Sequence, residues 1–588
     1  MCGIAGVLRG RANARELLAA LAHRGPDGEG SVDLGACSLA MTRLAILDPA
    51  PRSDQPMRWG DATIVFNGEI YNFLDLRREL QSYGWSFETT GDTEVLLKAL
   101  LQWGEGALSR VHGMYALLFW RDDGQELWAA RDPLGIKPLY WGPMSGGGAV
   151  FASEAMVVTE LVGRRVSPRA VAEFLHFGSP YAVTAFEGVL ELRPGEVTIF
   201  RRDGSVDVRS CDSVGPDSGT VKDLLAGAVH SHLVSDRPLA LFLSGGFDSA
   251  LIASQTTNAS VRPTGITIDT GTNVADVAGA RQTAAHYGLA LEVIPYRLED
   301  AVHRLEIYLH SMDQPTTDGF NTFIVSDAAN AAGFPVALSG LGGDEILGGY
   351  GYYQRARWMA RASRPYNKLP EWARPAVDRA VAARTGRVPS QAGSILAART
   401  TVDRYQAWRS IFTAEEVRRL TGIYPDPAMV TIDGLEVGAT AELRALDFEL
   451  YLGSTLLRDA DVFSMACGVE VRVPLLDRAF VDHIHTELPG AKKIDLARAL
   501  HDGYLERVAG RKKMTFRLPW SQWIETLVPT EELLAEADPW HGLVDPVEAR
   551  VLVSADQRPP VDRLLALVVL ARWLDGLATA RRIAPRPV

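Results

Sequence analysis

Four short, largely apolar runs alternate with helical patterns between residues 238 and 340, and this alternation limits the possible folds most strongly. The runs are PLALFL (238–243), TGITI (264–268), LEVIPY (291–296) and FPVALSG (334–340). Strands that are apolar on both faces are typical of a parallel sheet covered by helices on both sides. The sequence therefore predicts a doubly wound α/β domain. From Arg355 onward the patterns are almost all helical, which predicts a helical C-terminal part.

The first 155 residues have a different pattern. Short apolar stretches such as GIAGVL, ATIVFNGEIYN and GMYALLFW are separated by turn residues, and helical patterns at 73–83 and 93–103 interrupt them. This spacing predicts a sandwich or a layered α/β/β/α domain. We interpret residues 161–217 as connecting structure. The 588 residues thus divide into two predicted domains, 2–210 and 211–588, each large enough for a core of its own.

Charge and cysteine content argue against several classes of protein. The chain has 60 Lys and Arg against 72 Asp and Glu, a net charge of −12, which argues against binding nucleic acid by charge neutralisation. The apolar run Leu564–Ala571 is too short to cross a membrane, which takes about 20 residues, and the start MCGIAGVLRG lacks signal-peptide features. The four cysteines, Cys2, Cys37, Cys211 and Cys467, are widely spaced. We therefore expect no disulfide framework, no zinc site and a reducing, cytoplasmic location.

Cys2 is the first candidate catalytic residue. Removal of the initiating methionine would leave it with a free α-amine, which titrates near 7.7–8.0 and can activate the thiol as a general base. Taken alone, Cys2 is better explained as a small apolar residue that opens a strand. Asn67-Gly68 is likewise either a hairpin turn or an amide and a backbone N–H that form an oxyanion hole. With Arg43 for a carboxylate and Asp92 for an ammonium, these residues describe a site for an α-amino acid with a reactive carbonyl.

A second candidate site follows the strand PLALFL. The segment Ser244–Ser249 (SGGFDS) is a glycine turn that leads into a helix, and helix N-termini favour anions. No GxxxxGK[ST] pattern occurs, so the turn is not a Walker-type loop. Asp344, in VALSGLGGDEILGGY, could share a Mg²⁺ with Asp248, or could simply begin a solvated helix. In RKKMTF, Lys513 could meet a developing pyrophosphate, although such a basic trio is usually a solvated surface.

The N-terminal motifs resemble the glutaminase domain of class II amidotransferases, the N-terminal-nucleophile type. They are CGIAGVL, HRGPDGEG, RLAILD, FNGEIYN, GDTEVLL, HGMYALLFW and RDPLGIKPLYW, and their order covers nearly all of residues 2–155. The resemblance implies that Cys2 attacks the glutamine side-chain amide and that Asn67 and Gly68 stabilise the oxyanion. It also implies that Arg43, Ile46, Glu69 and Asp92 hold the glutamine. We interpret His23, Arg24 and Asp27 as loop structure.

The C-terminal motifs resemble the ATP-pyrophosphatase half of glutamine-hydrolysing asparagine synthetases. In that family ATP and a carboxylate form an acyl-adenylate, which ammonia from the glutaminase, carried through an internal tunnel, converts to an amide. The resemblance implies that Asp248 and Asp344 bind Mg²⁺ and that Lys513 is a catalytic residue. It also implies small-molecule substrates, namely glutamine, ATP and a carboxylate, and it is compatible with a homodimer. The implied ATP and pyrophosphate site is Leu243, Ser244, Gly245, Gly246, Asp248, Ser249, Ile268, Ser339 and Gly340, and the implied acceptor pocket is Leu341, Gly342 and Asp344.

Three features depart from that family and leave the acceptor open. Leu341 stands where the family usually has an acidic residue, and Asp459 stands where it usually has a lysine, with Arg458 beside it. From Leu305 to Gln354 the sequence contains no Lys or Arg, although a second carboxylate on the acceptor would favour a nearby cation. The acceptor is therefore either aspartate, with cations supplied from elsewhere, or a less charged carboxylate such as a secondary-metabolite or sugar acid.

Three other functions compete with this interpretation. A glutaminase joined to a sugar-phosphate isomerase or phosphoribosyl transferase is disfavoured by the SGGFDS loop. A ring-forming synthetase that uses an internal amine remains an alternative, although the complete Cys2 motif set favours glutamine as donor. A non-catalytic regulatory protein is disfavoured because both motif sets are complete.

Overall fold

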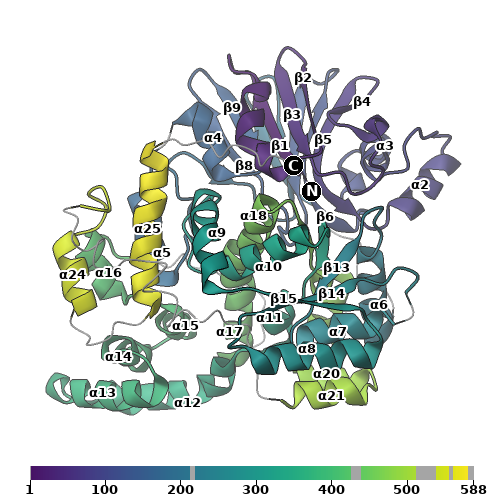
Figure 1. The fold of residues 1–588 in the computed structure, drawn as a ribbon. Helices are drawn as coiled ribbons and strands as arrows, with labels where there is room; N and C mark the ends of the chain where they lie inside the picture. The colour runs from purple at the N-terminus through teal and green to yellow at the C-terminus, as the bar shows by residue number, and fades with distance from the viewer. Residues whose placement is uncertain are drawn as a thin grey trace.

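Two six-stranded antiparallel sheets form the N-terminal part of the computed structural model, which describes residues 2–163, 165–211, 219–257, 259–425, 439–511, 538–554 and 561–579. The first sheet has the order β10 (Leu190–Glu191), β8 (Tyr140–Met144), β9 (Gly148–Ala152), β1 (Cys2–Leu8), β3 (Cys37–Arg43) and β2 (Gly28–Asp33). The second has the order β12 (Val206–Ser210), β11 (Glu196–Phe200), β7 (Glu126–Arg131), β6 (Gly113–Arg121), β5 (Ala62–Ile70) and β4 (Met57–Trp59). Both sheets lie in the upper half of Figure 1.

The two sheets face each other across an apolar core, and helices cover their outer faces. The inner core contains Ile4, Leu39, Leu118 and Phe151, because alternate residues of each strand point inward. Helices α2 (Phe73–Ser82) and α3 (Thr93–Trp103) pack on the second sheet. Helices α1 (Leu18–Leu21), α4 (Ala155–Val162) and α5 (Pro168–Phe177) lie on the side of the first. The predicted α/β/β/α layering is confirmed.

The second part is built on a five-stranded parallel sheet. Its strand order is β15 (Leu291–Pro295), β14 (Thr264–Asp269), β13 (Leu239–Phe242), β16 (Val336–Leu338) and β17 (Glu470–Arg472). On β13, Ala240 belongs to the core under α10 (Phe320–Ala331) and α18 (Arg458–Ala466), whereas Leu239 and Leu241 belong to the core under α7 (Phe247–Gln255) and α8 (Val274–Tyr287). The predicted doubly wound sheet is therefore confirmed.

The strand order of this sheet reverses between β13 and β16. Strands β14 and β15 lie on one side of β13, and β16 and β17 lie on the other. Ligands of open α/β sheets bind beyond the carboxyl ends of the strands at such a reversal. The two loops at this point are the one that follows β13, with SGGFDS, and the one that follows β16, with SGLGGDE.

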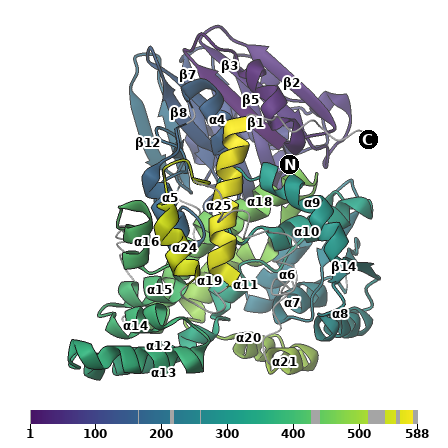
Figure 2. The same ribbon diagram turned by 60° about the vertical axis from the view of Figure 1, so that its left-hand side comes forward.

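Helices complete the second part and join it to the first. The helices beside the sheet are α6 (Val221–His232), α9 (Leu298–His310), α11 (Gly343–Leu347), α19 (Arg478–Glu487), α20 (Lys493–Ala499) and α21 (Gly503–Ala509). The others are α12 (Gly351–Tyr366), α13 (Arg374–Thr385), α14 (Pro389–Ala397), α15 (Thr401–Arg409), α16 (Ala414–Thr421), α17 (Ala439–Leu446), the π-helix η6 (Asp447–Leu457), α24 (Pro546–Ser554) and α25 (Val561–Thr579). Figure 2 shows α25 standing upright beside α5. None of the described helices is long and apolar enough to span a membrane.

One sequence interpretation of the fold is wrong. Residues 161–217 are not merely a connection, because they supply α5 and the strands β10, β11 and β12 to both N-terminal sheets. The predicted helical C-terminal part is confirmed, and within it the short strand β17 completes the parallel sheet. That strand is only three residues long and carries Glu470 and Arg472 on either side of Val471, so it has no apolar signature. Its two charges are buried and paired with each other, Arg472 Nε donating to Glu470 Oε1 at 2.6 Å.

Candidate active sites

Cys2 is the first residue of strand β1 and lies directly opposite Arg43 on β3. Its side chain is buried, and burial raises the pKa of the Cys2 thiol above its usual value. The thiol therefore does not ionise readily on its own, and a base is needed to take its proton during attack. The Cys2 backbone nitrogen donates to Asn67 Oδ1 at 2.9 Å, which fixes the two residues relative to each other.

Asn67 and Gly68 lie on strand β5, beside Cys2. Asn67 is fully buried, and its Nδ2 has no hydrogen-bond partner among the described residues. A buried amide donor without a partner costs free energy. A ligand that accepts a hydrogen bond from Asn67 Nδ2 would remove this cost. Gly68 has φ +154°, and a Cβ there would lie 2.0 Å from the Met114 carbonyl oxygen on β6, so this position requires glycine. The structure thus brings the predicted nucleophile and both predicted oxyanion donors together.

The predicted glutamine-binding residues line one cavity with Cys2. We call it the Cys2 cavity; its lining residues are Cys2, Arg43, Leu44, Ile46, Leu47, Ser53, Gln55, Phe66, Gly68, Glu69, Thr89, Gly91, Asp92 and Thr93. Asp92 Oδ2 accepts the Ile70 N–H at 2.9 Å, and burial raises the pKa of Asp92 to about 6 despite that hydrogen bond.

Arg43 is already well supplied with acceptors. Its Nη1 donates to Asp54 Oδ1 at 2.6 Å, and its Nη2 donates to the Asp48 carbonyl at 2.7 Å. The Asp54 side chain is 57% exposed, so it is the partner that a substrate carboxylate could replace at least cost.

Glu69 connects the Cys2 cavity to the second part of the molecule. Its Oε1 lies 3.2 Å from Arg472 Nη2 on strand β17, and both side chains are buried. Burial raises the pKa of Glu69, and the nearby Glu470 carboxylate adds to this effect. The Glu69 carboxylate is thus held by the parallel sheet and not by its own domain alone.

Arg24 has a larger structural role than a loop residue. It is fully buried, and its guanidinium donates to Glu154 Oε1 at 2.9 Å and to Asp461 Oδ2 at 2.6 Å. Its Nε also donates to the Cys2 carbonyl at 3.4 Å. Arg24 therefore links the backbone of the nucleophile to helix α18 of the other domain, and no local sequence pattern indicates this pairing across 437 positions.

The SGGFDS loop stands at the carboxyl end of β13, and α7 begins within it at Phe247. The Gly245 N–H donates to Asp276 Oδ1 at 2.9 Å, and the Gly246 N–H donates to Ser244 Oγ at 3.1 Å. The Ser244 N–H donates to Ser249 Oγ at 3.1 Å. The loop amides thus converge on side-chain oxygens, an arrangement that also suits phosphate oxygens.

Most of the predicted nucleotide-binding residues line a second cavity of about 260 Å³, which we call the Asp248 cavity. It lies between the SGGFDS and SGLGGDE loops, which touch at Gly340, where a Cβ would lie 2.9 Å from Asp248 Cβ. Gly342 does not line the cavity; it precedes α11 with φ +88°. The predicted residues that line the cavity are Leu243, Ser244, Asp248, Ser249, Ile268, Ser339, Gly340 and Leu341.

Asp248 and Asp344 converge on one cation, Lys493. Its Nζ donates to Asp248 Oδ2 and to Asp344 Oδ1, each at 2.5 Å. Although burial opposes the charge, the two carboxylates raise the pKa of Lys493. Two carboxylates that share a cation suit Mg²⁺, which commonly binds one or two carboxylates together with substrate phosphates. No set of three His, Cys, Asp or Glu side chains forms a metal site within the described ranges.

Lys493 was not among the residues predicted from the sequence. It is the first residue of α20, where the helix dipole disfavours a cation, and this position is a weak signal for a nearby anion. Lys513, the predicted catalytic lysine, lies outside the described residues.

Asp459, at the position where we noted an unusual carboxylate, faces the loop before α10. Its Oδ2 accepts from Thr316 Oγ1 at 2.6 Å, and its Oδ1 accepts from Arg458 Nη2 at 3.0 Å. Burial raises the pKa of Asp459 to about 6, although Arg458 opposes the shift. The charge of Arg458 is thus compensated inside α18.

Three consecutive residues of α18 reach three different places. Asp459 contacts Thr316, Ala460 lines the Asp248 cavity, and Asp461 contacts Arg24 behind Cys2. Successive helical residues point about 100° apart, so one buried helix can touch all three. The two candidate sites are therefore separated by α18.

Comparison with known proteins agrees with this arrangement. Residues 1–210 match the family model described as a glutamine amidotransferase domain, and residues 220–574 match the model described as asparagine synthase. "Asparagine synthetase [glutamine-hydrolyzing] 1" of Bacillus subtilis is 28% identical over 89% of this chain and 88% of its own length. "Putative asparagine synthetase [glutamine-hydrolyzing]" of Mycobacterium tuberculosis is 30% identical over 85% of this chain and 83% of its own. "Amidase chry2" of Gibberella zeae is 28% identical over 56% of this chain and 54% of its own.

These matches and the two sites support a ligase that uses glutamine and ATP to form an amide. The chain belongs to the family of glutamine-hydrolysing asparagine synthetases.

Proposed function

We propose that this enzyme hydrolyses glutamine at Cys2 and passes the ammonia internally to an acyl-adenylate in the Asp248 cavity. The products are an amide, glutamate, AMP and pyrophosphate. The observation that carries the proposal is helix α18, which touches the Asp248 cavity through Ala460 and the Cys2 strand through Asp461 and Arg24. A single helix thus lies between a nucleophile site and a nucleotide-type site.

In the glutaminase half, Cys2 Sγ attacks the side-chain carbonyl carbon of glutamine. The α-amine of Cys2, released from the initiating methionine, takes the thiol proton and delivers it to the leaving ammonia. Water then attacks the resulting glutamyl thioester, the C–S bond breaks, and glutamate leaves as the Cys2 thiol is restored. Asn67 Nδ2 and the Gly68 N–H stabilise the oxyanion, in keeping with the unsatisfied amide donor. Asp92 and Glu69 face the substrate ammonium, and Arg43 receives the substrate carboxylate.

In the synthetase half, an oxygen of the acceptor carboxylate attacks the α-phosphorus of ATP and pyrophosphate leaves. The SGGFDS loop holds the phosphates through its backbone amides. Mg²⁺ held by Asp248 and Asp344 would neutralise charge on the leaving pyrophosphate, and it would compete with Lys493 for these carboxylates. Ammonia then attacks the acyl carbon, and AMP leaves with the C–O electron pair.

Internal transfer of ammonia has a physical reason. At neutral pH free ammonia is mostly protonated, and the protonated form has no lone pair for attack. Ammonia released in the buried Cys2 cavity stays neutral if it moves through the protein interior. Retention of the complete Cys2 site favours glutamine as nitrogen donor over a ring-forming reaction that uses an internal amine.

A Cys2→Ala variant tests the division into two sites. We expect it to lose glutamine-dependent amide formation and to keep ammonia-dependent formation, measured as amide and AMP by mass spectrometry. Cys37→Ala is the matched control, because Cys37 is also a buried free cysteine but lies at the far end of β3 from the cavity. Loss of ammonia-dependent synthesis in a folded Cys2→Ala protein would contradict the proposal.

A further inference from the structure

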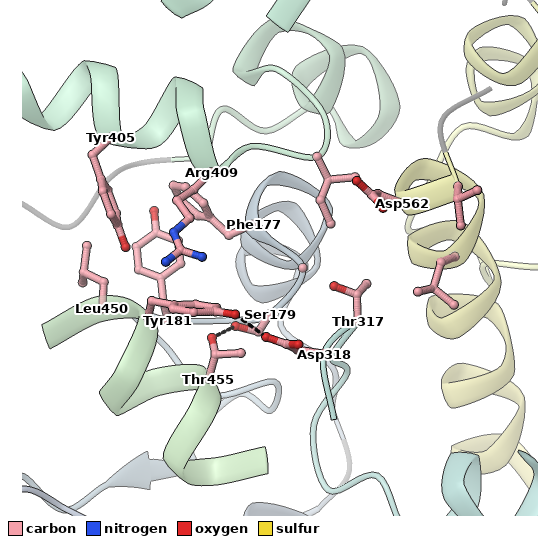
Figure 3. Close-up of a pocket in the computed structure, with 15 residues that line it drawn as sticks. Phe177, Ser179, Tyr181, Thr317, Asp318, Tyr405, Arg409, Leu450, Thr455 and Asp562 are labelled. Atoms are coloured by element: carbon pink, nitrogen blue, oxygen red, sulfur yellow. Dashed lines mark hydrogen bonds between the residues drawn. The ribbon is translucent and has the colours of Figure 1, made fainter. Parts of the chain in front are cut away.

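A third cavity lies next to the Asp248 cavity and has walls of aromatic side chains. We call it the aromatic pocket; its volume is about 270 Å³, similar to that of the Asp248 cavity. Its walls include Phe177, Tyr181, Tyr405 and Tyr451, and Arg409 is the only cation among the described residues that line it. Figure 3 shows the Arg409 guanidinium beside Phe177, with Asp318 and Thr317 on one side of the cavity and Asp562 on the other.

The aromatic pocket and the Asp248 cavity share two walls. In the segment before and within α10, Thr317 and Asp318 line the pocket, and Asn321 and Thr322 line the Asp248 cavity. In the continuous helix of η6 and α18, Thr455 lines the pocket and Ala460 lines the Asp248 cavity. The linings of the two cavities are thus three residues apart in the first segment, from Asp318 to Asn321, and five apart in the second, from Thr455 to Ala460.

The one cation in the described lining of the pocket, Arg409, is already compensated. The Nε and Nη2 of Arg409 both donate to Asp447 Oδ1, at 3.0 and 2.5 Å, and the guanidinium lies 3.6 Å from the centroid of the Tyr451 ring. The Tyr451 hydroxyl donates to Asp318. A second carboxylate on the ligand would find no uncompensated cation here, and burial of an unpaired charge is costly.

The described lining of the Asp248 cavity also supplies no cation for a second carboxylate. Within the described part of the chain, none of its lining residues is Lys, Arg or His, and Leu341 presents an apolar side chain to it. At the neighbouring wall, Arg458 is engaged by Asp459. Aspartate, with two carboxylates and an ammonium, matches this environment poorly.

Resting on the proposed function, we propose that the aromatic pocket holds the body of the acceptor and that the acceptor is a monocarboxylic acid with an aromatic ring. Ring edges and faces of Phe177 and Tyr181, themselves in a T-shaped contact with centroids 4.8 Å apart, pack against that ring. The carboxylate extends past Thr317 into the Asp248 cavity. Arg409 donates a hydrogen bond to an uncharged polar group on the ring, such as a phenol or carbonyl oxygen.

The first experiment compares acceptors with the full-length enzyme, Mg-ATP and ammonia. Aspartate is compared with benzoic, hydroxybenzoic, phenylpropanoic and indole carboxylic acids, and AMP and amide are measured by mass spectrometry. We expect at least one aromatic acid to exceed aspartate in kcat/KM by tenfold or more. Efficient amide formation from aspartate, with all aromatic acids inactive, would overturn the assignment.

A matched pair of variants on α25 then locates the acceptor. Leu564 and Leu565 are both half-buried, but only Leu565 lines the pocket. Leu565→Trp narrows the pocket, so we expect the KM of the aromatic acid to rise about tenfold or more, while the KM of ATP and the glutaminase rate stay unchanged. Leu564→Trp leaves all of these unchanged. An equal effect of the two variants on the acid would refute the pocket.

Failure of the proposed function would look different. In that case no acid would release AMP, and binding of the same aromatic acids would be measured by isothermal titration calorimetry. Binding that is weakened in Leu565→Trp and kept in Leu564→Trp supports the pocket as a site for aromatic acids. Absence of binding to the unmodified protein overturns it.

Discussion

Replacement of Asn67 by Asp isolates one hydrogen-bond donor of the glutaminase site. In the structure Asn67 Oδ1 accepts the Cys2 nitrogen at 2.9 Å, and Nδ2 has no partner among the described residues. An aspartate keeps an oxygen for the Cys2 nitrogen but places a second oxygen where the donor was. The contact that positions Cys2 therefore survives, and the proposed oxyanion donor is lost.

The expected loss follows from the burial of this side chain. Removal of one oxyanion donor lowers kcat by about 10²–10³, or about 2.7–4 kcal/mol. Because Asn67 is fully buried, solvent cannot replace the donor, and the aspartate charge would also repel the oxyanion. We therefore expect Asn67→Asp near the upper end of that range and Asn67→Ala near the lower end. The KM for glutamine should change little, because the donor acts on the transition state.

Glutamate release measures the effect, and ammonia-dependent AMP release reports whether the synthetase half is intact. Asn72→Asp is the matched control, since Asn72 is in the same motif and its side chain bonds to the Arg110 carbonyl and the His112 N–H. We expect it to change glutaminase kcat less than about threefold, because Asn72 bonds to the backbone of Arg110 and His112, whereas Asn67 bonds to the Cys2 nitrogen. If folded Asn67→Ala and Asn67→Asp both keep kcat within about tenfold of the unmodified enzyme, Nδ2 does not serve the oxyanion.

Three other predictions follow from the two sites. Asp92, whose pKa is about 6, must be ionised to hold the substrate ammonium, so kcat/KM for glutamine should fall more steeply with pH below about 6 than above it. If the Asp92→Asn enzyme shows the same steeper fall below pH 6, Asp92 does not have this role. Lys493→Met leaves two facing carboxylates without their cation, so we expect the free energy of unfolding to fall by about 1–3 kcal/mol. Calorimetry should also show a larger rise in Tm on adding Mg²⁺ than in the unmodified protein, and equal rises would show that Mg²⁺ does not bind Asp248 and Asp344. Gly68→Ala would bring a Cβ within 2.0 Å of a backbone oxygen, so glutaminase activity should fall at least about 100-fold while ammonia-dependent AMP release persists. Near-normal glutamate release would show that the Gly68 backbone need not keep this conformation.

The sequence predicts those parts of the fold that have a local pattern. The helix at 93–103 is found at Thr93–Trp103, and the run at 264–268 is found as β14 at Thr264–Asp269. Strand β17 has no such pattern, because its burial depends on an ion pair between Glu470 and Arg472 and on pairing with β16. Its position is fixed by contacts that are distant in the sequence, which no local periodicity reports.

The candidate sites divide in the same way. Cys2, Asn67, Gly68 and Asp92 lie together because each sits in a motif whose strand or helix is predictable, and they line one cavity or contact it directly. Arg24 could not be assigned to the link between domains, since Asp461 lies 437 positions away. The three cavities likewise arise from elements that meet only in the folded chain, and the aromatic pocket draws on five separate segments.

Helix α18 also limits how enzymes of this kind can diverge. Insertion or deletion of one residue within Arg458–Ala466 would turn every following side chain by about 100°, so that Asp461 would lose Arg24 or Ala460 would leave the Asp248 cavity. New acceptors are therefore expected to evolve by substitution on α15 and α25, which supply residues to the aromatic pocket and none to the Cys2 cavity. The length of α18 should remain constant among relatives even where their substrates differ.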